Sequence, residues 1–202
     1  MGGTGGHESH RFQPGGYVDA PVREGAPGAG VRTGRVAMSD DELRKIIGKP
    51  MSKSKVVVER GPVANFATAV CDPNPVYRDP RAAADAGLRA IPVPPTYPFV
   101  MQAWGEFPED QPADKPKGNP LGEVIGPLMA KGGIILHGEQ EFVYHRPVYV
   151  GDVLDGEGTV VDAYTKDSKG RTMTFVVTET VWKDRHTGEP VVTSRFNVIH
   201  RA

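Results

Sequence analysis

The sequence is poor in cysteine, in charge of one sign and in long apolar runs. Cys71 is its single cysteine, which excludes an internal disulfide and fits a reducing compartment. Its 24 Lys and Arg residues nearly balance 25 Asp and Glu residues, so charge gives no support to nucleic-acid or anionic-membrane binding. No apolar run reaches the ~20 residues that span a bilayer, and no secretory signal is recognisable. We therefore expect a cytoplasmic protein without a membrane span.

The 202 residues divide into a tail and one domain. Residues 1–37 are rich in glycine and proline and lack apolar periodicity, so we predict that this extension is disordered. Its two histidines, His7 and His10, have no supporting ligand residues, and we predict no metal site and no cofactor. Ser39, followed by acidic residues, is a helix N-cap candidate and marks the start of a domain over residues 38–202.

The first half of the domain is predicted to be mainly helical. A β-branched run at residues 55–59 predicts a strand. A helix follows to residue 70, with Val63, Phe66 and Val70 on its apolar face, and Asp72-Pro73 ends it. Asp79 is expected to cap a second, short helix. A third is expected at residues 97–107, capped by Thr96 and apolar almost all round, which predicts a buried position.

The second half has the pattern of a sheet. Residues 107–129 form a Pro/Gly-rich insertion, predicted to be a long loop. Four runs of strand character follow at residues 133–145, 152–166, 171–184 and 190–200, separated by turn-like links. Short links predict an antiparallel meander. The expected class is α+β, with a curved antiparallel sheet around a central helix.

One stretch carries recognisable chemistry. "FATAVCDPNPVYRDPRAA" (residues 66–83) resembles the hydratase motif of the MaoC-like (R)-specific enoyl-CoA hydratases and hydroxyacyl dehydratases. Two positions depart from that motif: Cys71 replaces a glycine, and Tyr77 stands where the family has histidine. "HGEQEFVYHRPVYVGD" (residues 137–152) is similar to the FAS1-like dehydratase N-terminal branch of the same hot-dog superfamily. The matching positions of the first motif are Phe66, Asp72, Asn74, Pro75, Val76 and Ala83.

The resemblance implies a hot-dog domain that acts on acyl-CoA or acyl-carrier-protein thioesters as a dimer. In the family, an aspartate and a histidine hold a water and move a proton beside the thioester. A tyrosine, with a pKa near about 10, is a poor replacement base at neutral pH. The implied catalytic residues are Asp72, Tyr77 and His137. The implied substrate-binding residues are Asn74, Pro75, Pro95, Thr96, Tyr97, Gly138 and Arg146.

Plainer interpretations of these residues stay open. Asp72 and Asn74 both precede prolines and can simply end a helix, and Tyr77 can be a packed aromatic. His137 and His145 are separated by an even number of residues on a predicted strand, so both are expected on one face. Arg146 can either build a turn or meet a CoA phosphate.

Three functions are compatible with these features. The first is the accessory subunit of a heterodimeric hydratase or dehydratase for (3R)-hydroxyacyl or trans-2-enoyl thioesters, with a second hot-dog subunit that keeps the Asp/His pair. The second is a self-sufficient homodimeric enoyl-CoA hydratase that uses Asp72. The third is a non-catalytic acyl-CoA-binding module. A hot-dog thioesterase fits the turn less well.

Overall fold

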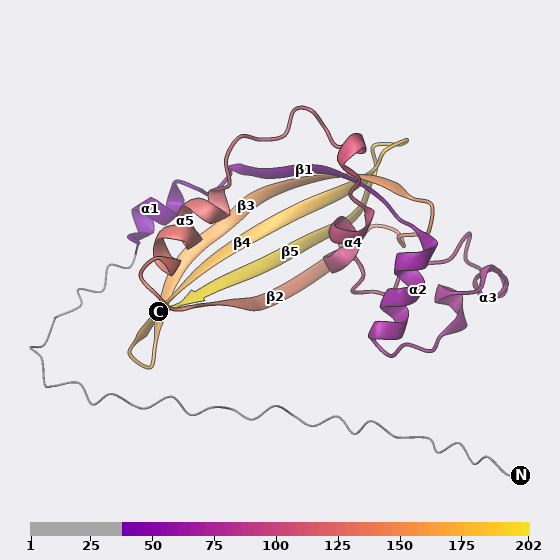
Figure 1. Cartoon of the computed structure of the whole chain (residues 1–202), viewed down its shortest axis with the longest axis horizontal. Coiled ribbons are helices and arrows are strands. Elements are labelled where there is room, and N and C mark those ends of the chain that lie inside the picture. The colour runs from indigo at the N-terminus through magenta and orange to yellow at the C-terminus, as the bar shows by residue number, and fades with distance from the viewer. Residues whose placement is uncertain (1–37) are drawn as a thin grey trace, which may run out of the picture. The chain divides into compact units, whose positions relative to one another are not determined.

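The computed structural model describes residues 38–202, and the predicted disorder of residues 1–37 lies outside them. A five-stranded antiparallel sheet has the strand order β1-β3-β4-β5-β2 (Figure 1). The expected α+β class is confirmed. The strands are β1 (Pro50–Val57), β2 (Ile134–Tyr144), β3 (Val153–Ser168), β4 (Arg171–Asp184) and β5 (Pro190–Arg201). The helices are α1 (Asp40–Arg44), α2 (Arg60–Ala69), α3 (Pro80–Asp85), α4 (Pro98–Gly105) and α5 (Pro120–Met129), with 3₁₀ turns η1 (Pro75–Tyr77) and η2 (Pro108–Asp110).

The predicted meander is right for three strands and wrong for the fourth. Strands β3, β4 and β5 follow one another as hairpins, but β2 pairs with β5 and not with β3. The link from β2 to β3 is no tight turn, because Val148 accepts a hydrogen bond from the Val93 amide and Tyr149 bridges to Pro92. The link between β2 and β3 therefore crosses from one side of the sheet to the other. Strands β1 and β2 form the two edges of the sheet.

The helices pack against the sheet in two groups, and α4 and α5 lie across the same face (Figure 1). One core cluster joins α2 and α4 to the sheet through Val63, Phe66, Tyr97, Met101, Leu154 and Trp182. A second joins α1 and α5 to it through Leu43, Ile46, Val124, Leu128, Val160 and Val176. These clusters place the turn after α2 at one end of the sheet and α5 at the other.

Two predicted apolar faces are less buried than expected. Val63 and Phe66 are buried, but Val70 is 46 % exposed because α2 ends at Ala69. Helix α4 buries Met101 and Gly105, whereas Phe99 and Trp104 on its other side are 53 % and 41 % exposed. The expectation of a helix buried all round was therefore wrong for this chain by itself.

The predicted loop at residues 107–129 contains helix α5. Asn119 Oδ1 accepts a hydrogen bond from the Gly122 amide at 3.1 Å and caps the helix, which continues through Pro127. Val124 and Leu128 are buried against the second core cluster. The loop prediction failed because tertiary burial of one apolar face outweighed the glycine and proline content.

The insertion also covers the β1 edge of the sheet. The Gln111 side chain accepts a hydrogen bond from the Lys55 amide at 3.0 Å and donates one to the Lys55 carbonyl at 2.9 Å. Lys55 Nζ pairs in addition with Asp110 at 2.8 Å. The Gln111 side chain thus makes the two backbone hydrogen bonds to Lys55 that a neighbouring strand would make, and it blocks that edge.

Candidate active site

The turn that carries Asp72 begins with a Schellman motif at the end of α2. The Cys71 amide donates to the Thr68 carbonyl at 3.0 Å and the Asp72 amide to the Ala67 carbonyl at 2.9 Å. Cys71 has a φ of 57°, in the left-handed region that such motifs require and that favours glycine. This left-handed conformation explains why the family motif has glycine at this position. Cys71 adopts the same conformation with a steric penalty that glycine does not have.

Replacing Cys71 by glycine is expected to stabilise the protein by about 1 kcal/mol, because the left-handed conformation loses its steric penalty. The thiol is exposed, so little packing is lost. Urea unfolding of Cys71→Gly beside the wild type measures the difference. An unchanged or lower free energy of unfolding would contradict this account of the turn.

The side chains of Asp72 and Asn74 both accept hydrogen bonds from backbone amides. Asp72 Oδ1 accepts from the Asn74 amide at 2.9 Å, and Asn74 Oδ1 accepts from the Val76 amide at 3.1 Å, which starts η1. These are consecutive Asx turns of the kind expected for Asp and Asn before proline. They hold the Asp72 carboxylate in a fixed direction while using one of its two oxygens.

Arg78 ties this turn to α2, and the sequence reasoning did not identify it. Its Nη1 donates to the carbonyls of Asp72 at 3.0 Å and Asn74 at 3.4 Å, and its Nη2 donates to Thr68 Oγ1 at 3.1 Å. Arg60 in turn donates to the Arg78 carbonyl at 2.8 Å. The arginine directly after Tyr77 is the one signal of these contacts in the sequence, but they form only where several carbonyls of one turn converge.

Tyr77 lies near Asp72, and Tyr144 lies near Tyr77. Burial raises the pKa of Tyr77, and the Asp72 carboxylate raises it further. Burial likewise raises the pKa of Tyr144 on β2, with Tyr77 as a second cause, and the Tyr144 hydroxyl donates to the Pro95 carbonyl at 2.8 Å. Both phenols therefore stay protonated at neutral pH and act as hydrogen-bond donors, not as bases.

The residues expected at the start of the central helix have different surroundings. Pro95 and Thr96 are exposed, whereas Tyr97 is 1 % exposed and packs edge-on against Phe66 at 5.5 Å. Burial, with Glu59 as a second cause, raises the pKa of Tyr97 to about 12. The N-cap of α4 is Tyr97, without a side-chain hydrogen bond, and the predicted Thr96 cap is off by one residue. Tyr97 is thus a core residue next to the site.

His137 is not brought to Asp72 within the chain. Its ring packs against Phe99 at 5.2 Å and Phe196 at 4.6 Å. His137 lies seven positions before Tyr144 on β2, about 20 Å along a strand. Within residues 38–202, the ring contacts of His137 are with Phe99 and Phe196, and they do not involve the Asp72 turn.

A β-bulge follows His137 and overturns the expectation that His137 and His145 face the same side. His137 pairs with Val198 and Gln140 with Phe196, so β2 has one extra residue there. The extra residue reverses the alternation, and His145 contacts Thr193 Oγ1 at 3.1 Å on the opposite face. Gly138 fits the bulge because a Cβ there would lie 2.9 Å from the Asn197 carbonyl oxygen.

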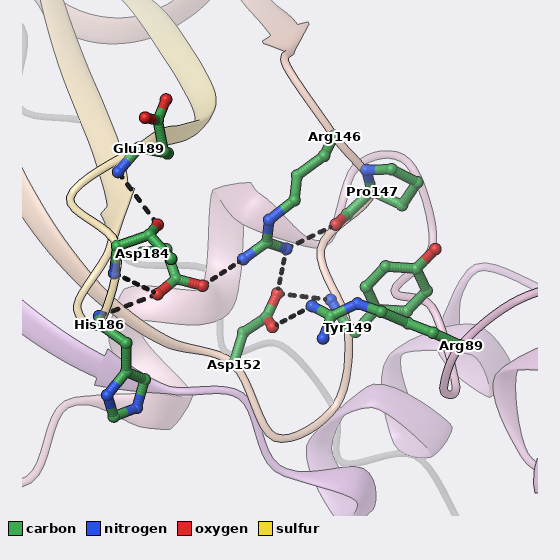
Figure 2. Close-up of polar contacts among 9 residues, drawn as sticks. Arg89, Arg146, Pro147, Tyr149, Asp152, Asp184, His186 and Glu189 are labelled. Carbon is green, nitrogen blue, oxygen red and sulfur yellow. Dashed lines mark hydrogen bonds and ion pairs between the residues drawn. The ribbon is translucent and has the colours of Figure 1, made fainter.

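Arg146 is held between two carboxylates (Figure 2). Its Nη1 pairs with Asp152 Oδ2 at 2.6 Å and its Nη2 with Asp184 Oδ2 at 2.7 Å. Asp152 is 7 % exposed and also accepts from Arg89 at 2.7 Å and from the Tyr149 amide at 2.9 Å. Of the two interpretations, these contacts support the turn-building one, because the guanidinium is engaged inside the fold.

The Asp184 carboxylate is held by its own hairpin as well. The backbone amide of His186, followed by that of Thr187 and by Arg146, lowers the pKa of Asp184. The cluster therefore joins Arg89, the β2–β3 link and the β4–β5 hairpin in one charged network (Figure 2).

Most of the domain matches a known protein family. Residues 45–194 match the family model described as FAS1-like, dehydratase domain region. A UPF0336 protein of Thermobifida fusca is 34 % identical over 138 residues, which are 68 % of this chain and 78 % of the relative. Mesaconyl-CoA hydratase of Haloarcula marismortui is 43 % identical over 76 residues, which are 37 % of this chain and 20 % of that enzyme.

Solved structures show the same fold. A chain of the ChsH1–ChsH2 complex of Mycobacterium tuberculosis superposes with a TM-score of 0.62 at 23 % identity, covering 79 % of this chain and 89 % of that one. A chain of the HadBC (3R-hydroxyacyl-ACP dehydratase) complex of the same organism gives 0.56 at 22 % identity, covering 76 % and 96 %. The expected hot-dog fold is confirmed. Within residues 38–202, no helix is long and apolar enough to cross a membrane.

Proposed function

The chain belongs to the FAS1-like dehydratase domain family, and we propose that it is a component of a hydratase/dehydratase for (3R)-hydroxyacyl or trans-2-enoyl thioesters of coenzyme A or acyl carrier protein. The observation that carries the proposal is the turn after α2. By its resemblance to the family's hydratase motif, this turn carries Asp72 at the position of the catalytic aspartate and Tyr77 at the position of the histidine. The hydrogen bond from the Asn74 amide orients the Asp72 carboxylate, and the Asp72 carboxylate adds to the effect of burial on the pKa of Tyr77. The mesaconyl-CoA hydratase relative supports the substrate class.

The turn supplies one of the two acid/base groups that hydration needs. Hydration adds the hydroxyl of water to the β-carbon and a proton to the α-carbon, so one group must accept a proton and one must donate it. Asp72 can orient the water or accept its proton. Tyr77, with its pKa raised, can donate a hydrogen bond but does not accept a proton near pH 7. We infer that the second acid/base group comes from another subunit.

The β2 edge offers a place for that subunit. The β1 edge is occupied by Gln111, whereas β2 forms the other edge of the sheet. The exposed large apolar residues of β2 are Ile134, Ile135, Val143 and Tyr144. An exposed apolar edge strand pairs readily with a second chain. We therefore infer that a hot-dog subunit with an intact Asp/His pair docks along β2, next to Tyr144 and the Asp72 turn.

The test compares the purified chain with its complex with a co-expressed hot-dog subunit that carries Asp-x-Asn-Pro-x-His. The chain alone is expected to hydrate crotonyl-CoA at least about 10²-fold more slowly than the complex, the contribution of a positioned acid/base group. Loss of the conjugated thioester absorbance measures the rate. Full turnover by the chain alone would favour a self-sufficient homodimer. Thioester binding without turnover in any complex would favour a binding module.

A further inference from the structure

The free edge of β1 presents the backbone groups of alternate residues. In an antiparallel strand, the N–H and C=O of one residue point to the same side, and successive residues alternate. Directly after β1, the Val58 amide donates to the Asp152 carbonyl at 2.9 Å, on the β3 side of the strand. The residues that point their backbone groups away from β3 are therefore Lys53, Lys55 and Val57.

Gln111 occupies the middle of these positions. The segment between α4 and α5 passes over β1 (Figure 1), and the Gln111 side chain makes both backbone hydrogen bonds of Lys55 there. Its Nε2 donates in addition to the Phe107 carbonyl at 2.9 Å, within the same segment. These three contacts fix the plane of the side-chain amide against the edge of the strand.

The positions on either side of Lys55 are covered as well. Gly105, at the end of α4, lies so close to β1 that a Cβ there would overlap the Val57 carbonyl oxygen. Lys53 Nζ pairs with Asp114 Oδ2 at 2.5 Å. The residues that together cover the strand, which we call the edge cap, are Gly105, Asp110, Gln111 and Asp114.

An uncovered β1 edge fits the same strand of a second copy of this chain. Two β1 strands can pair antiparallel about Ser54, which places a lysine of each copy opposite a lysine of the other. Facing like charges would oppose such a pairing, but Asp110 and Asp114 already pair with both lysines inside one chain. The state of the backbone groups, and thus Gln111, then decides whether this edge pairs.

We propose that the β1 edge is a self-association surface that the edge cap keeps closed. A subunit with two open edges adds neighbours on both sides and grows into an open array, whereas a subunit with one open edge stops at a pair. The cap therefore directs assembly to β2. The proposal goes beyond the proposed function, because it concerns how the assembly stops growing and requires no thioester chemistry.

Sedimentation velocity of the full chain, over a range of protein concentrations, tests this with Gln111→Ala. The variant frees the Lys55 amide and carbonyl but leaves both ion pairs in place. At the highest concentration, its weight-average mass is expected to be at least about twice that of the wild type, because an open edge pairs with a second copy. The Lys55 amide should exchange its hydrogen faster in dilute solution, where the copies are apart.

Two further variants separate edge pairing from general damage to the fold. Gln102→Ala is the matched control, because Gln102 donates to Glu106 beside the cap without a contact to β1, and it should sediment like the wild type. Lys55→Pro in the Gln111→Ala background removes the freed amide, and proline is tolerated where the N–H points away from the sheet. This double variant is expected to return to the wild-type mass.

The results that would overturn the proposal are equally definite. If Gln111→Ala keeps the wild-type mass at every concentration, the cap does not control association. If the variant grows but Lys55→Pro does not reverse the growth, or if Gln102→Ala grows as well, the association does not run through the β1 edge. The hydration assay has no part in these outcomes, so failure of the hydratase function leaves this proposal standing.

Discussion

Tyr77→His is expected to raise the rate at which the purified chain hydrates crotonyl-CoA by about 10²-fold, because it restores the second acid/base group beside Asp72. The backbone of η1 is already held by the Asn74 cap and by Arg78, so the imidazole enters a preformed turn. Burial, the larger cause of the raised pKa of Tyr77, would lower the pKa of a histidine at this position, whereas the Asp72 carboxylate would raise it. The rate should increase with pH through the pKa of the imidazole, whose ordinary value is about 6.5.

Two further variants separate catalysis from folding. Tyr77→Phe keeps the ring without a titratable group and is expected to show no gain. Asp72→Asn in the Tyr77→His background should remove the gain, since both groups act on one water. Asparagine keeps the side-chain oxygen that caps the Asn74 amide, so the turn stays in place. A gain that survives Asp72→Asn would mean that the turn is not the catalytic site.

Asp152→Ala is expected to destabilise the protein by about 1–3 kcal/mol, because it removes the acceptor of the Tyr149 amide and leaves Arg146 with Asp184 as its remaining carboxylate partner. Asp152 accepts from three donors at 2.6–2.9 Å: Arg89, and both Arg146 and the Tyr149 amide of the β2–β3 link (Figure 2). Urea unfolding, followed by circular dichroism, measures the loss.

Asp155→Ala is the control for this prediction. Asp155 pairs with Arg185 at 2.9 Å, but the two side chains are 41 % and 49 % exposed. Solvent screens such a pair, so its loss should cost less than about 1 kcal/mol. If the two alanine variants unfold at the same urea concentration, the charged network does not stabilise the fold in the way the contacts indicate.

Local features of the fold were predictable from the sequence because their causes are local. The capping box at Ser39 and Glu42 and the N-cap at Asp79 follow from side chains within three residues of the amides they bind. The four later strands follow from β-branched runs between turns. The Asp72 turn was located for the same reason, since proline after Asp and Asn restricts the backbone there.

The remaining features depend on residues far apart in the sequence. The pairing of β2 with β5 requires the link at Val148 and Tyr149 to meet Pro92 and Val93. The bulge after His137 is fitted to the Asn197 carbonyl of another strand and reverses the face of His145. Arg146 offered two interpretations until its carboxylate partners were in place. Patterns within a short window carry no information about such partners.

Strand β2 is translated well before the strand on which it depends. Its residues pair with positions that follow them by between 48 residues, for Tyr144 and Val192, and 67 residues, for Ile134 and Arg201. While the ribosome is still making β3 and β4, β2 has no neighbour in this sheet, and pairings of such long sequence separation form slowly. The edge to which we assign the second subunit therefore does not exist on the nascent chain. Assembly of the pair must wait for the C-terminal strand, and a chain that stops before Pro190 would lose its partner along with β5.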